Sequence, residues 1–501
     1  MSDYPSIFND VIGPVMRGPS SSHTAASVRI GRMAAQLFGD MPKEVMIDFD
    51  PTGSLATTYD GQGSKIGLLG GFMGLELDDA RLWEAESMAR EQGLYMEVRI
   101  VPYPNNHPNT YKMALKAPNM EPMSITAIST GGGMVEIVEL DGHKVSCRGG
   151  AHEYFFYSGD SVIHQKFEQS LGREEADQMA KQYGASKTRY AAPVLPVLDR
   201  EAAQVPFITA AQMTEYAQKH HHSHLWELAA IYESHRGGIS TTRVVEMMKE
   251  IVIKIKKSIE SGLEGTHYHD RILDCQIISF KESLKAGKLF PASLVNTMIA
   301  YTISMMEVKS SMGVIVAAPT AGACAVLPGA VLGAAKELDL SIDDVVKAML
   351  SAGMIGVLIA KHATFAAEVG GCQAECGSGS GMAAAALVEI NGGGYGEAMT
   401  AASFALQNIL GMVCDPVANR VEVPCMGKNV MGAMNALSSA TMALAGVDAV
   451  IPLDEVISAM DKVGKMLPFE LRCTGYGGLS ITPTALRMVN PLSLSNDMQT
   501  T

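Results

Sequence analysis

The stretch VMGAMNALSSATMALAGV, residues 430–447, indicates the fold of the second half of the chain. It is rich in Ala, Gly and Met, and residues 215–501 are helix-like almost throughout. Small residues let helix axes approach closely, and methionines fill irregular gaps in a core. The sequence therefore predicts an all-α domain over residues 215–501, built around a buried centre.

The first part of the chain alternates helix and strand patterns instead. A helix is predicted over residues 23–38, ending at Gly39, and a second over 79–91. The segment EVMIDFD (44–50) alternates apolar and polar residues like a half-buried strand, and Asp141 with Gly142 favours a tight hairpin turn. Residues 1–150 thus read as an α+β domain, followed by a connecting segment over 151–214.

Composition excludes several classes of partner. The chain has 501 residues, 47% of them hydrophobic, which is enough for large buried cores. A formal net charge of -14 without a basic cluster argues against nucleic acid or an anionic membrane, because both require a concentrated Lys/Arg surface. We expect no nucleic acid and no membrane as partners. Small molecules or protein subunits remain, and the composition is compatible with a homodimer.

The N-terminal sequence MSDYPSIFNDVIG lacks a basic region followed by an apolar one, so no signal peptide is expected. The uncharged stretch 312–335 is interrupted by Pro319 and Pro328, which favours two short buried elements over a membrane span. We therefore expect a cytoplasmic protein whose eight cysteines stay reduced.

Three of these cysteines lie in glycine- and proline-flanked segments: Cys372 in VGGCQAE, Cys414 in MVCDPVANR and Cys425 in VEVPCMGKN. Their spacing is too wide for a zinc finger. Three thiolates on one metal centre would leave a coordination position open, as a catalytic site requires. Cys414 and Cys425, 11 residues apart, are expected on one irregular loop. On these residues alone, burial as small apolar side chains and metal ligation both remain open.

Two other segments carry candidate binding groups. Ser20, Ser21, Ser22 and Thr24 surround His23 in GPSSSHT, at the start of a predicted helix. Such a segment can cap the helix or bind a carboxylate or phosphate, and His23 adds a group that titrates near neutral pH. Thr320, in AAPTAGA, lies at a break in an apolar run that is either a plain turn or the lining of a pocket.

Taken together, the motifs resemble the iron–sulfur-dependent L-serine dehydratases, in the order of that family's β segment followed by its α segment. The segments that carry this resemblance are GPSSSHT, GSLATTYDGQGSKIGLLGG (53–71), HPNT (107–110), AISTGGG (127–133), AAPTAGA, GGCQAE, CDPVA and VPCMGKN. The resemblance implies an α+β domain followed by an all-helical catalytic domain. It also implies a [4Fe–4S] cluster held by Cys372, Cys414 and Cys425, with the fourth iron open to substrate.

The implied reaction is that of a carbon–oxygen lyase, which converts L-serine or a close β-hydroxy amino acid to a 2-oxo acid and ammonia without pyridoxal phosphate. A Lewis-acidic iron would help to expel the β-hydroxyl group. His23 is the expected base for the α-proton, and the adjacent serines would bind the substrate carboxylate. A different hydroxy acid as substrate, or a non-catalytic cluster or zinc protein, are the alternatives.

The chain also departs from that family. It reads GQGSK at residues 61–65, where family members commonly read GHGTD, so substrate preference is open. A family RET-type motif appears as Arg472–Cys473–Thr474, which makes Cys473, together with Cys376, a reserve ligand. The sequence ends in NDMQTT, without the cysteine that caps the open iron in some relatives. The stretch after Gly150 is short for an ACT-type regulatory domain, and no complete one is expected.

Overall fold

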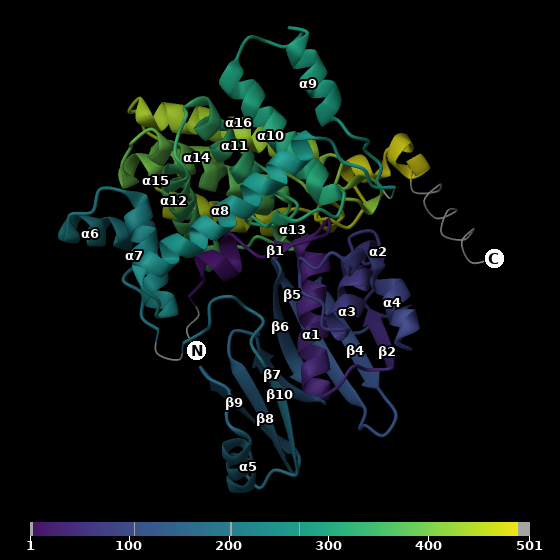
Figure 1. Cartoon of the computed structure of the whole chain (residues 1–501). Helices are drawn as coiled ribbons and strands as arrows, with labels where there is room; N and C mark the ends of the chain where they lie inside the picture. Colours follow the sequence, from purple (N-terminus) through teal and green to yellow (C-terminus); the bar gives the residue numbers. More distant parts are fainter. Residues whose placement is uncertain (1–3, 105, 201–202, 270, 489–501) are drawn as a thin grey trace. The chain divides into compact units, whose positions relative to one another are not determined.

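The computed structural model describes residues 4–104, 106–200, 203–269 and 271–488 (Figure 1). Their contacts divide the chain into two units. The α+β unit comprises residues 22–203, and the helical unit comprises residues 4–21 and the chain from residue 204 onward. The expected fold class is confirmed, since a sheet-rich α+β region is followed by a mostly helical one. The terminal residues NDMQTT lie outside the described residues.

A six-stranded sheet forms the centre of the α+β unit, with strand order β3-β2-β4-β5-β6-β7. Strands β2 and β3 are parallel, and all other neighbours are antiparallel. Apolar residues alternate along β2, where Val45, Ile47 and Phe49 are buried, as predicted. The strands are β2 (Glu44–Phe49), β3 (Tyr95–Ile100), β4 (Thr110–Lys116), β5 (Met123–Gly131), β6 (Met134–Leu140) and β7 (His143–Cys147).

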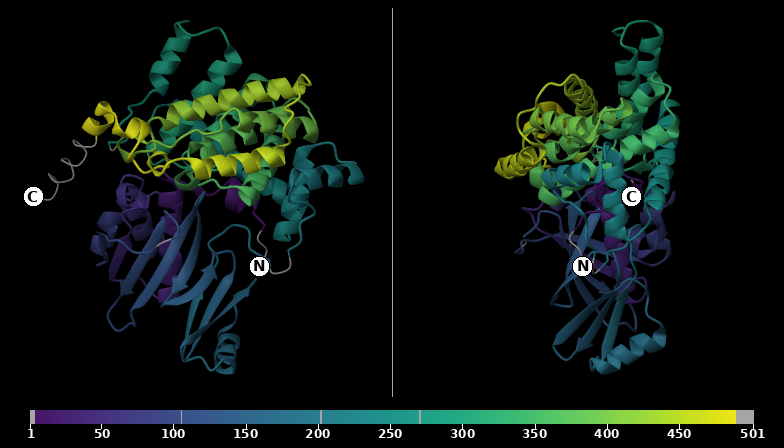
Figure 2. Two further views of the ribbon diagram at one scale, coloured as in Figure 1. Left: turned by 180° about the vertical axis from the view of Figure 1, so that it is seen from behind. Right: turned by 90° about the vertical axis from the view of Figure 1, so that its left-hand side faces the viewer.

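Helices α1 (Ala26–Phe38) and α3 (Ser64–Phe72) lie on one face of this sheet, which Figure 2 also shows from behind. Helix α1 ends at Gly39, as predicted, with a φ of 97° that favours glycine. The two helices touch through glycines, since a Cβ atom on Gly31 would lie 2.6 Å from the Leu68 carbonyl oxygen. Shorter helical elements complete this layer: η2 (Ser21–Ala25), α2 (Leu55–Thr58), η3 (Leu82–Glu84) and α4 (Ala85–Glu91).

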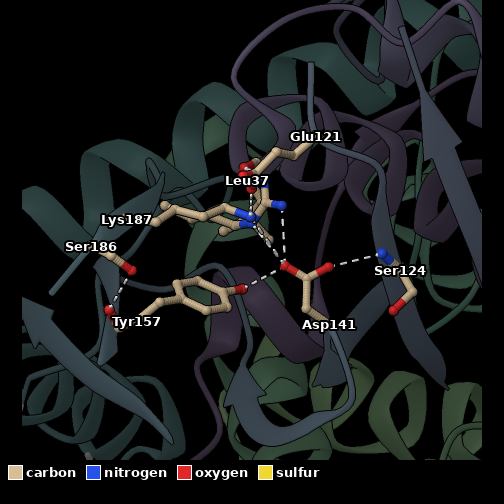
Figure 3. A network of polar contacts seen from close by, with 8 residues as sticks. Leu37, Glu121, Ser124, Asp141, Tyr157, Ser186 and Lys187 are labelled. Atoms are coloured by element: carbon tan, nitrogen blue, oxygen red, sulfur yellow. Dashed lines mark hydrogen bonds and ion pairs between the residues drawn. The ribbon is translucent and has the colours of Figure 1, made fainter. Parts of the chain in front are cut away.

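The predicted hairpin between β6 and β7 is confirmed, and its turn residue Asp141 also links the two sheets of the unit. A three-stranded sheet of order β10-β8-β9 follows, made of β8 (His152–Ser158), β9 (Ser161–Phe167) and β10 (Lys187–Ala191), with helix α5 (Arg173–Gln182) before β10. The Asp141 carboxylate accepts hydrogen bonds from the Tyr157 hydroxyl (2.9 Å) and the Ser124 amide (3.0 Å) (Figure 3). Arg189 donates to the same carboxylate at 3.1 Å and to the Leu37 carbonyl at 2.9 Å. This Asp141 network therefore joins both sheets to the end of α1.

The helical unit is built around α14 (Ser378–Ile390), whose residues are buried from Ser378 to Val388. Its small side chains let α11, α12, α15 and α16 pack around it. The longer helices of the unit are α6 (Ala210–His220), α7 (Leu225–Gly237), α8 (Thr241–Leu263), α9 (Ile277–Lys285), α10 (Ser293–Ser310), α11 (Val326–Glu337), α12 (Ile342–His362), α15 (Tyr395–Gln407), α16 (Cys425–Leu444) and α17 (Leu453–Met466). Short elements are α13 (Ala367–Gly370), η4 (Gln373–Gly377), η5 (Val417–Asn419), η6 (Phe469–Leu471) and η7 (Gly478–Ile481).

The N-terminal segment 4–21 is part of the helical unit. Its turn η1 (Ile7–Val11) is held by Glu233 of α7, which accepts hydrogen bonds from the Ser6 hydroxyl and from the Ile7 amide at 2.7 Å. Strand β1 (Val15–Met16) then pairs antiparallel with β11 (Ile315–Val316). Among the described residues, none of the helices has the length and apolar character required to span a membrane.

Candidate functional site

The loops that carry Cys372 and Cys414 are held together by backbone contacts in the helical unit. Gly371 has a φ of 73°, and a Cβ atom there would lie 2.7 Å from the Met412 carbonyl oxygen, so only glycine permits this approach. The Gln373 amide donates to the same Met412 oxygen at 3.1 Å. These contacts place the Cys372 and Cys414 sulfur atoms and a Glu375 carboxylate oxygen within 4.8 Å of one another.

Cys473 joins the same buried group. Its amide donates to the Cys414 carbonyl at 2.9 Å, and its side chain packs with those of Cys372 and Cys414. Cys425 is the first residue of helix α16, and burial together with the nearby Cys372 raises its pKa. The expectation that it shares an irregular loop with Cys414 is therefore wrong, since α16 begins directly after Pro424. We call Cys372, Cys414, Cys425 and Cys473 the cysteine group.

The electrostatics of the cysteine group disfavour ionised thiols in the absence of a cation. Hydrogen bonds with Cys372 and Cys473, together with burial, raise the pKa of the Cys414 thiol well above its usual value. Burial and the nearby Cys372 raise the pKa of Cys425 in the same direction. Burial also raises the pKa of Cys376, which contacts the Asn429 side-chain nitrogen at 3.7 Å. A bound metal would reverse this preference, because it favours the thiolate over the thiol.

Glu375 borders the cysteine group and connects it to the AAPTAGA segment. Thr320 donates its hydroxyl hydrogen to Glu375 at 2.7 Å, and the Ala321 amide donates to the Ser21 hydroxyl at 3.1 Å. Burial and the charge of Glu368 raise the pKa of Glu375 to about 7. The structure thus brings Ser21 into contact with the segment that contains Thr320. Ser20, which precedes Ser21 in the sequence, is also buried.

Lys428 places a positive charge against the cysteine group. Its ammonium nitrogen lies 3.8 Å from the Cys372 sulfur and 2.7 Å from an Asp415 carboxylate oxygen. Burial acts to lower the pKa of Lys428, but Cys372 and Asp415 outweigh it and raise that pKa above its usual value. Lys428 is therefore a permanent cation that offsets negative charge at this position.

The donor set fits a thiophilic metal centre. The thiols are buried and form no disulfide, and those of Cys372, Cys414 and Cys473 pack together. Cys425 is linked to them because Cys372, in addition to burial, raises its pKa. Soft thiolate ligands select zinc, copper(I) or iron–sulfur clusters over hard cations such as magnesium. The four cysteines of the group lie at least 11 residues apart in the sequence, which does not match the paired spacing of zinc fingers. The arrangement is thus compatible with an iron–sulfur cluster.

The other predicted residues lie in the α+β unit, where His23 is fully buried. Its Nε2 atom lies 2.7 Å from the Thr58 hydroxyl, and its Nδ1 atom lies 3.1 Å from the Ser22 hydroxyl. Thr58 donates its single hydroxyl hydrogen to the Ser54 carbonyl at 2.7 Å, so Nε2 must be the donor in its contact with Thr58. These bonds place the hydrogen of a neutral His23 on Nε2 and leave Nδ1 as the acceptor.

The altered GQGSK segment packs beside these residues. Thr24 donates to the Gln62 carbonyl at 2.8 Å, and a Cβ atom on Gly63 would lie 2.5 Å from the Thr24 hydroxyl oxygen. Ser64 contacts the Tyr111 hydroxyl at 3.0 Å. Lys65 instead forms a partly exposed ion pair with Glu86 at 2.7 Å. Lys65 is therefore paired at the surface of the unit.

Comparison with known proteins identifies the family. The family model described as serine dehydratase alpha chain matches residues 170–480, which is more than half of the chain. The chain belongs to the serine dehydratase family. It is 39% identical over 241 residues to the probable L-serine dehydratase alpha chain of Bacillus subtilis, covering 48% of this chain and 80% of that protein.

Two further relatives extend the match beyond the alpha-chain region of this serine dehydratase homologue. The probable L-serine dehydratase beta chain of Bacillus subtilis is 42% identical over 146 residues, which cover 29% of this chain and 64% of that protein. The L-serine dehydratase of Helicobacter pylori is 27% identical over 477 residues, covering 93% of this chain and 96% of that protein. The resemblance inferred from the motifs is confirmed.

Sequence reasoning on this serine dehydratase homologue missed several residues of the site. Glu375 and Lys428 stand inside the quoted cysteine motifs, three residues from Cys372 and Cys425 respectively, a spacing that keeps side chains on one side of a helical turn. Thr58 lies in GSLATT, but its contact with His23 spans 35 residues and follows only from the fold. The spacing from a cysteine could therefore have indicated Glu375 and Lys428, whereas nothing in the sequence indicates Thr58.

Proposed function

We propose that this chain is an L-serine dehydratase that converts L-serine, or a close β-hydroxy amino acid, to a 2-oxo acid and ammonia without pyridoxal phosphate. The observation that carries the proposal is the cysteine group, whose buried thiols form no disulfide and lie inside the region matched by the family model. Family membership and the names of its relatives support this reaction over an unrelated metal site.

We propose Cys372, Cys414 and Cys425 as the ligands of a [4Fe–4S] cluster, with Lys428 offsetting part of its negative charge. When bound, such a cluster supplies a Lewis-acidic iron that weakens the bond between the β-carbon and its hydroxyl group. Cys473 is the nearest further thiol, because it packs with Cys372 and Cys414. Whether Cys473 also binds the cluster is tested by its replacement with serine, followed by measurement of the iron content.

His23 is the proposed base for the α-proton of the substrate. The hydrogen bonds of the ring leave its hydrogen on Nε2, so Nδ1 carries the lone pair that would accept a proton. Thr58, fixed by its own bond to Ser54, would hold the ring in this tautomer. Loss of the α-proton and the β-hydroxyl group gives an enamine, which tautomerises and hydrolyses to the 2-oxo acid and ammonia.

The proposed substrate-binding hydroxyls differ in what they can offer. Thr24 donates its hydrogen to Gln62, and Thr320 donates its hydrogen to Glu375. A hydroxyl has a single hydrogen, so these two oxygens suit a donor such as the substrate ammonium group. We propose Ser20 and Ser21 as donors to the substrate carboxylate. Ser22 also contacts the substrate in this proposal, but its hydrogen is donated to His23 Nδ1, so its oxygen suits the ammonium group.

The decisive experiment is a substrate screen on the anaerobically purified chain. L-Serine, L-threonine and several hydroxy acids without an amino group are tested, and 2-oxo acid and ammonia are measured together with iron and acid-labile sulfide. Equal amounts of 2-oxo acid and ammonia from L-serine, by a brown protein that air bleaches, are the expected result. Turnover of a hydroxy acid without ammonia would replace the substrate assignment.

His23→Ala tests the base assignment in the same preparation. Turnover should fall by about 100-fold or more, since a positioned base contributes about that much or more, while iron content stays unchanged. Full turnover by a fully loaded His23→Ala protein would refute the role of His23. A colourless wild-type protein with one tightly held zinc ion would indicate a structural metal site in place of an enzyme.

Cytoplasmic localisation and a homodimer stay predictions, as do the domain limits 1–150, 151–214 and 215–501. A reducing compartment is consistent with the proposal, because it keeps the thiols of the cysteine group available to a metal.

A further inference from the structure

Two buried polar side chains in the α+β unit lack the partners that such groups normally have. The side-chain amide of Asn109 and the hydroxyl of Ser129 are both fully buried, and neither forms a hydrogen bond with any described residue. Buried side-chain polar atoms are paired in the large majority of cases, because an unmet hydrogen bond costs free energy. Both residues lie in the segments HPNT and AISTGGG, which carry part of the resemblance to the family.

The sheet register places these two side chains next to each other. Thr110 of β4 pairs with Ile128 of β5, so Asn109 stands opposite Ser129, and the Ser129 amide donates to the Asn109 carbonyl at 3.0 Å. Side chains alternate between faces along a strand, and directly opposite residues share a face. Asn109 therefore continues the buried row that includes Tyr111, and Ser129 continues the row that includes Ala127. Two adjacent buried rows thus each contain a polar side chain without a partner among the described residues.

The next polar group in the same row shows what a structural role looks like. The Tyr111 hydroxyl, two residues after Asn109, receives a hydrogen bond from Ser27 at 3.1 Å and contacts Ser64 at 3.0 Å. Both serines are also fully or almost fully buried. This part of the core thus provides partners for its own hydroxyls, whereas the position of Asn109 and Ser129 does not.

A chain of contacts connects this position to His23. The Ser54 amide donates to the Pro108 carbonyl at 3.0 Å, directly before Asn109 in the sequence. The Ser54 carbonyl accepts from Thr58, whose hydroxyl oxygen accepts from His23. On the other side, the buried Arg29 guanidinium donates to the Gly133 carbonyl at 2.6 Å, in the turn that follows Ser129.

From this geometry we propose that Asn109 and Ser129 bind the head group of an α-amino acid, the substrate of the proposed reaction. The Asn109 nitrogen and the Ser129 hydroxyl are donors that fit an α-carboxylate, and the Asn109 oxygen is an acceptor that fits the ammonium group. These two residues are positioning residues for the substrate, in addition to the serines near His23. The inference rests on the proposed function for the identity of the ligand, and on the unpaired atoms for its location.

The test uses Asn109→Leu and Ser129→Ala in the full-length, cluster-loaded chain, with Ser27→Ala as the matched buried serine. L-Alanine is the probe, because it carries the same head group but has no β-hydroxyl group to lose, and L-alaninamide is the control without a carboxylate. Melting temperature is measured anaerobically with and without each probe, and kcat and KM are measured for L-serine.

We expect Ser27→Ala to lower the melting temperature, because it removes a satisfied hydrogen bond. Asn109→Leu and Ser129→Ala should leave it unchanged or raise it, because they remove unpaired groups. L-Alanine, but not L-alaninamide, should stabilise the wild type and Ser27→Ala, and this shift should be lost in the other two variants. Their KM for L-serine should rise about 10-fold or more, with a smaller change in kcat.

Two results would overturn the proposal. If Asn109→Leu and Ser129→Ala lower the melting temperature as Ser27→Ala does, the two groups are structural. A second result would be that the two variants keep the melting temperature but also keep the L-alanine shift, or that the wild type shows no L-alanine shift at all. In either case the pair holds an ordered water molecule only. A wild type that binds L-alanine through Asn109 but does not deaminate L-serine would refute the proposed function and keep this site. A wild type that deaminates L-serine but whose L-alanine binding does not depend on Asn109 would refute this site and keep the proposed function.

Discussion

The Asp141 network and the cysteine group both hold ionisable side chains away from water, but they differ in how the charges are balanced. In the network, the Asp141 carboxylate meets the Arg189 guanidinium at 3.0 Å and a tyrosine hydroxyl, so the chain supplies every partner described for it. In the cysteine group, hydrogen bonds with neighbouring thiols and burial raise the pKa of Cys414, and burial raises that of Cys425. The single cation described in contact with a group thiol is Lys428, which is already paired with Asp415. A region that pairs its own charges supports the fold, whereas one that does not marks where a ligand binds.

The largest expected effect breaks the cysteine group. Cys372→Ser should abolish cluster iron and L-serine turnover together, because a serine hydroxyl does not replace a thiolate on iron. Iron, acid-labile sulfide and absorbance near 400 nm are measured after anaerobic purification. Cys147→Ser is the matched control, since Cys147 is equally buried but lies in the core of the α+β unit. A Cys372→Ser protein with full iron content would remove Cys372 from the ligand set.

A smaller effect is expected when the cation is removed from the cysteine group. Lys428→Met should weaken cluster retention by about 10–100-fold, as for other residues that contact metal ligands. The measurement is the rate at which iron is lost to a chelator under anaerobic conditions. Lys428→Arg keeps the charge and should behave like the wild type. Equal rates for all three proteins would show that the charge at 3.8 Å from Cys372 has no influence on the cluster.

The matching change in the Asp141 network should lower the stability of the fold and leave the iron content unchanged. Asp141→Asn keeps the size of the side chain and tolerates the φ of 50°, but it leaves the nearly buried Arg189 without its anion. We expect a loss of about 2 kcal/mol in unfolding free energy, below the usual cost for a fully buried pair because Asp141 is partly exposed. Denaturant titration of the α+β unit's transition provides the measurement.

Tyr157→Phe sharpens the same result, since it removes one hydrogen bond to Asp141 and should cost about 1 kcal/mol. Both variants should keep the iron content of the wild type. Iron loss in Asp141→Asn at a temperature where the protein is folded would contradict the separation between a stabilising region and a binding region.

The smallest effect concerns pH and a second internally paired group. Burial acts to raise the pKa of Glu153, but its hydrogen bond to His164 and the charge of Lys166 outweigh it and hold the pKa below its usual range. A carboxyl group with a lowered pKa in the folded state stabilises the protein above its unfolded pKa of about 4.3. This contribution is lost as the pH falls through the folded pKa. Glu153→Gln should therefore flatten the acid side of the stability curve, and an unchanged curve would contradict the pairing.

Local patterns allowed the elements and fold class to be predicted. The end of α1 at Gly39, the strand Glu44–Phe49 and the Asp141 turn each depend on residues a few positions apart, which a sequence displays directly. The helical character of the second half follows from its small residues, which α14 confirms. These features need no knowledge of distant contacts.

Long-range contacts limited what could be predicted for the site. The meeting of Cys372 with Cys414 agrees with the predicted trio, but the helical position of Cys425 and the packing of Cys473 depend on how separate segments converge. Asn109 and Ser129 read as ordinary motif residues until the β4–β5 register shows that they face each other. Their missing partners are a property of the folded core and leave no signal in the sequence.

The pairing of β1 with β11 determines how this chain can be divided. Residues 22–203 are inserted, in sequence, between two parts of the helical unit, because 4–21 belongs to that unit. A fragment starting at residue 204 would lack β1 and η1, leaving the edge of β11 and the Glu233 carboxylate without their partners. Helical halves made for study should therefore carry residues 4–21 joined to residue 204 by a flexible linker.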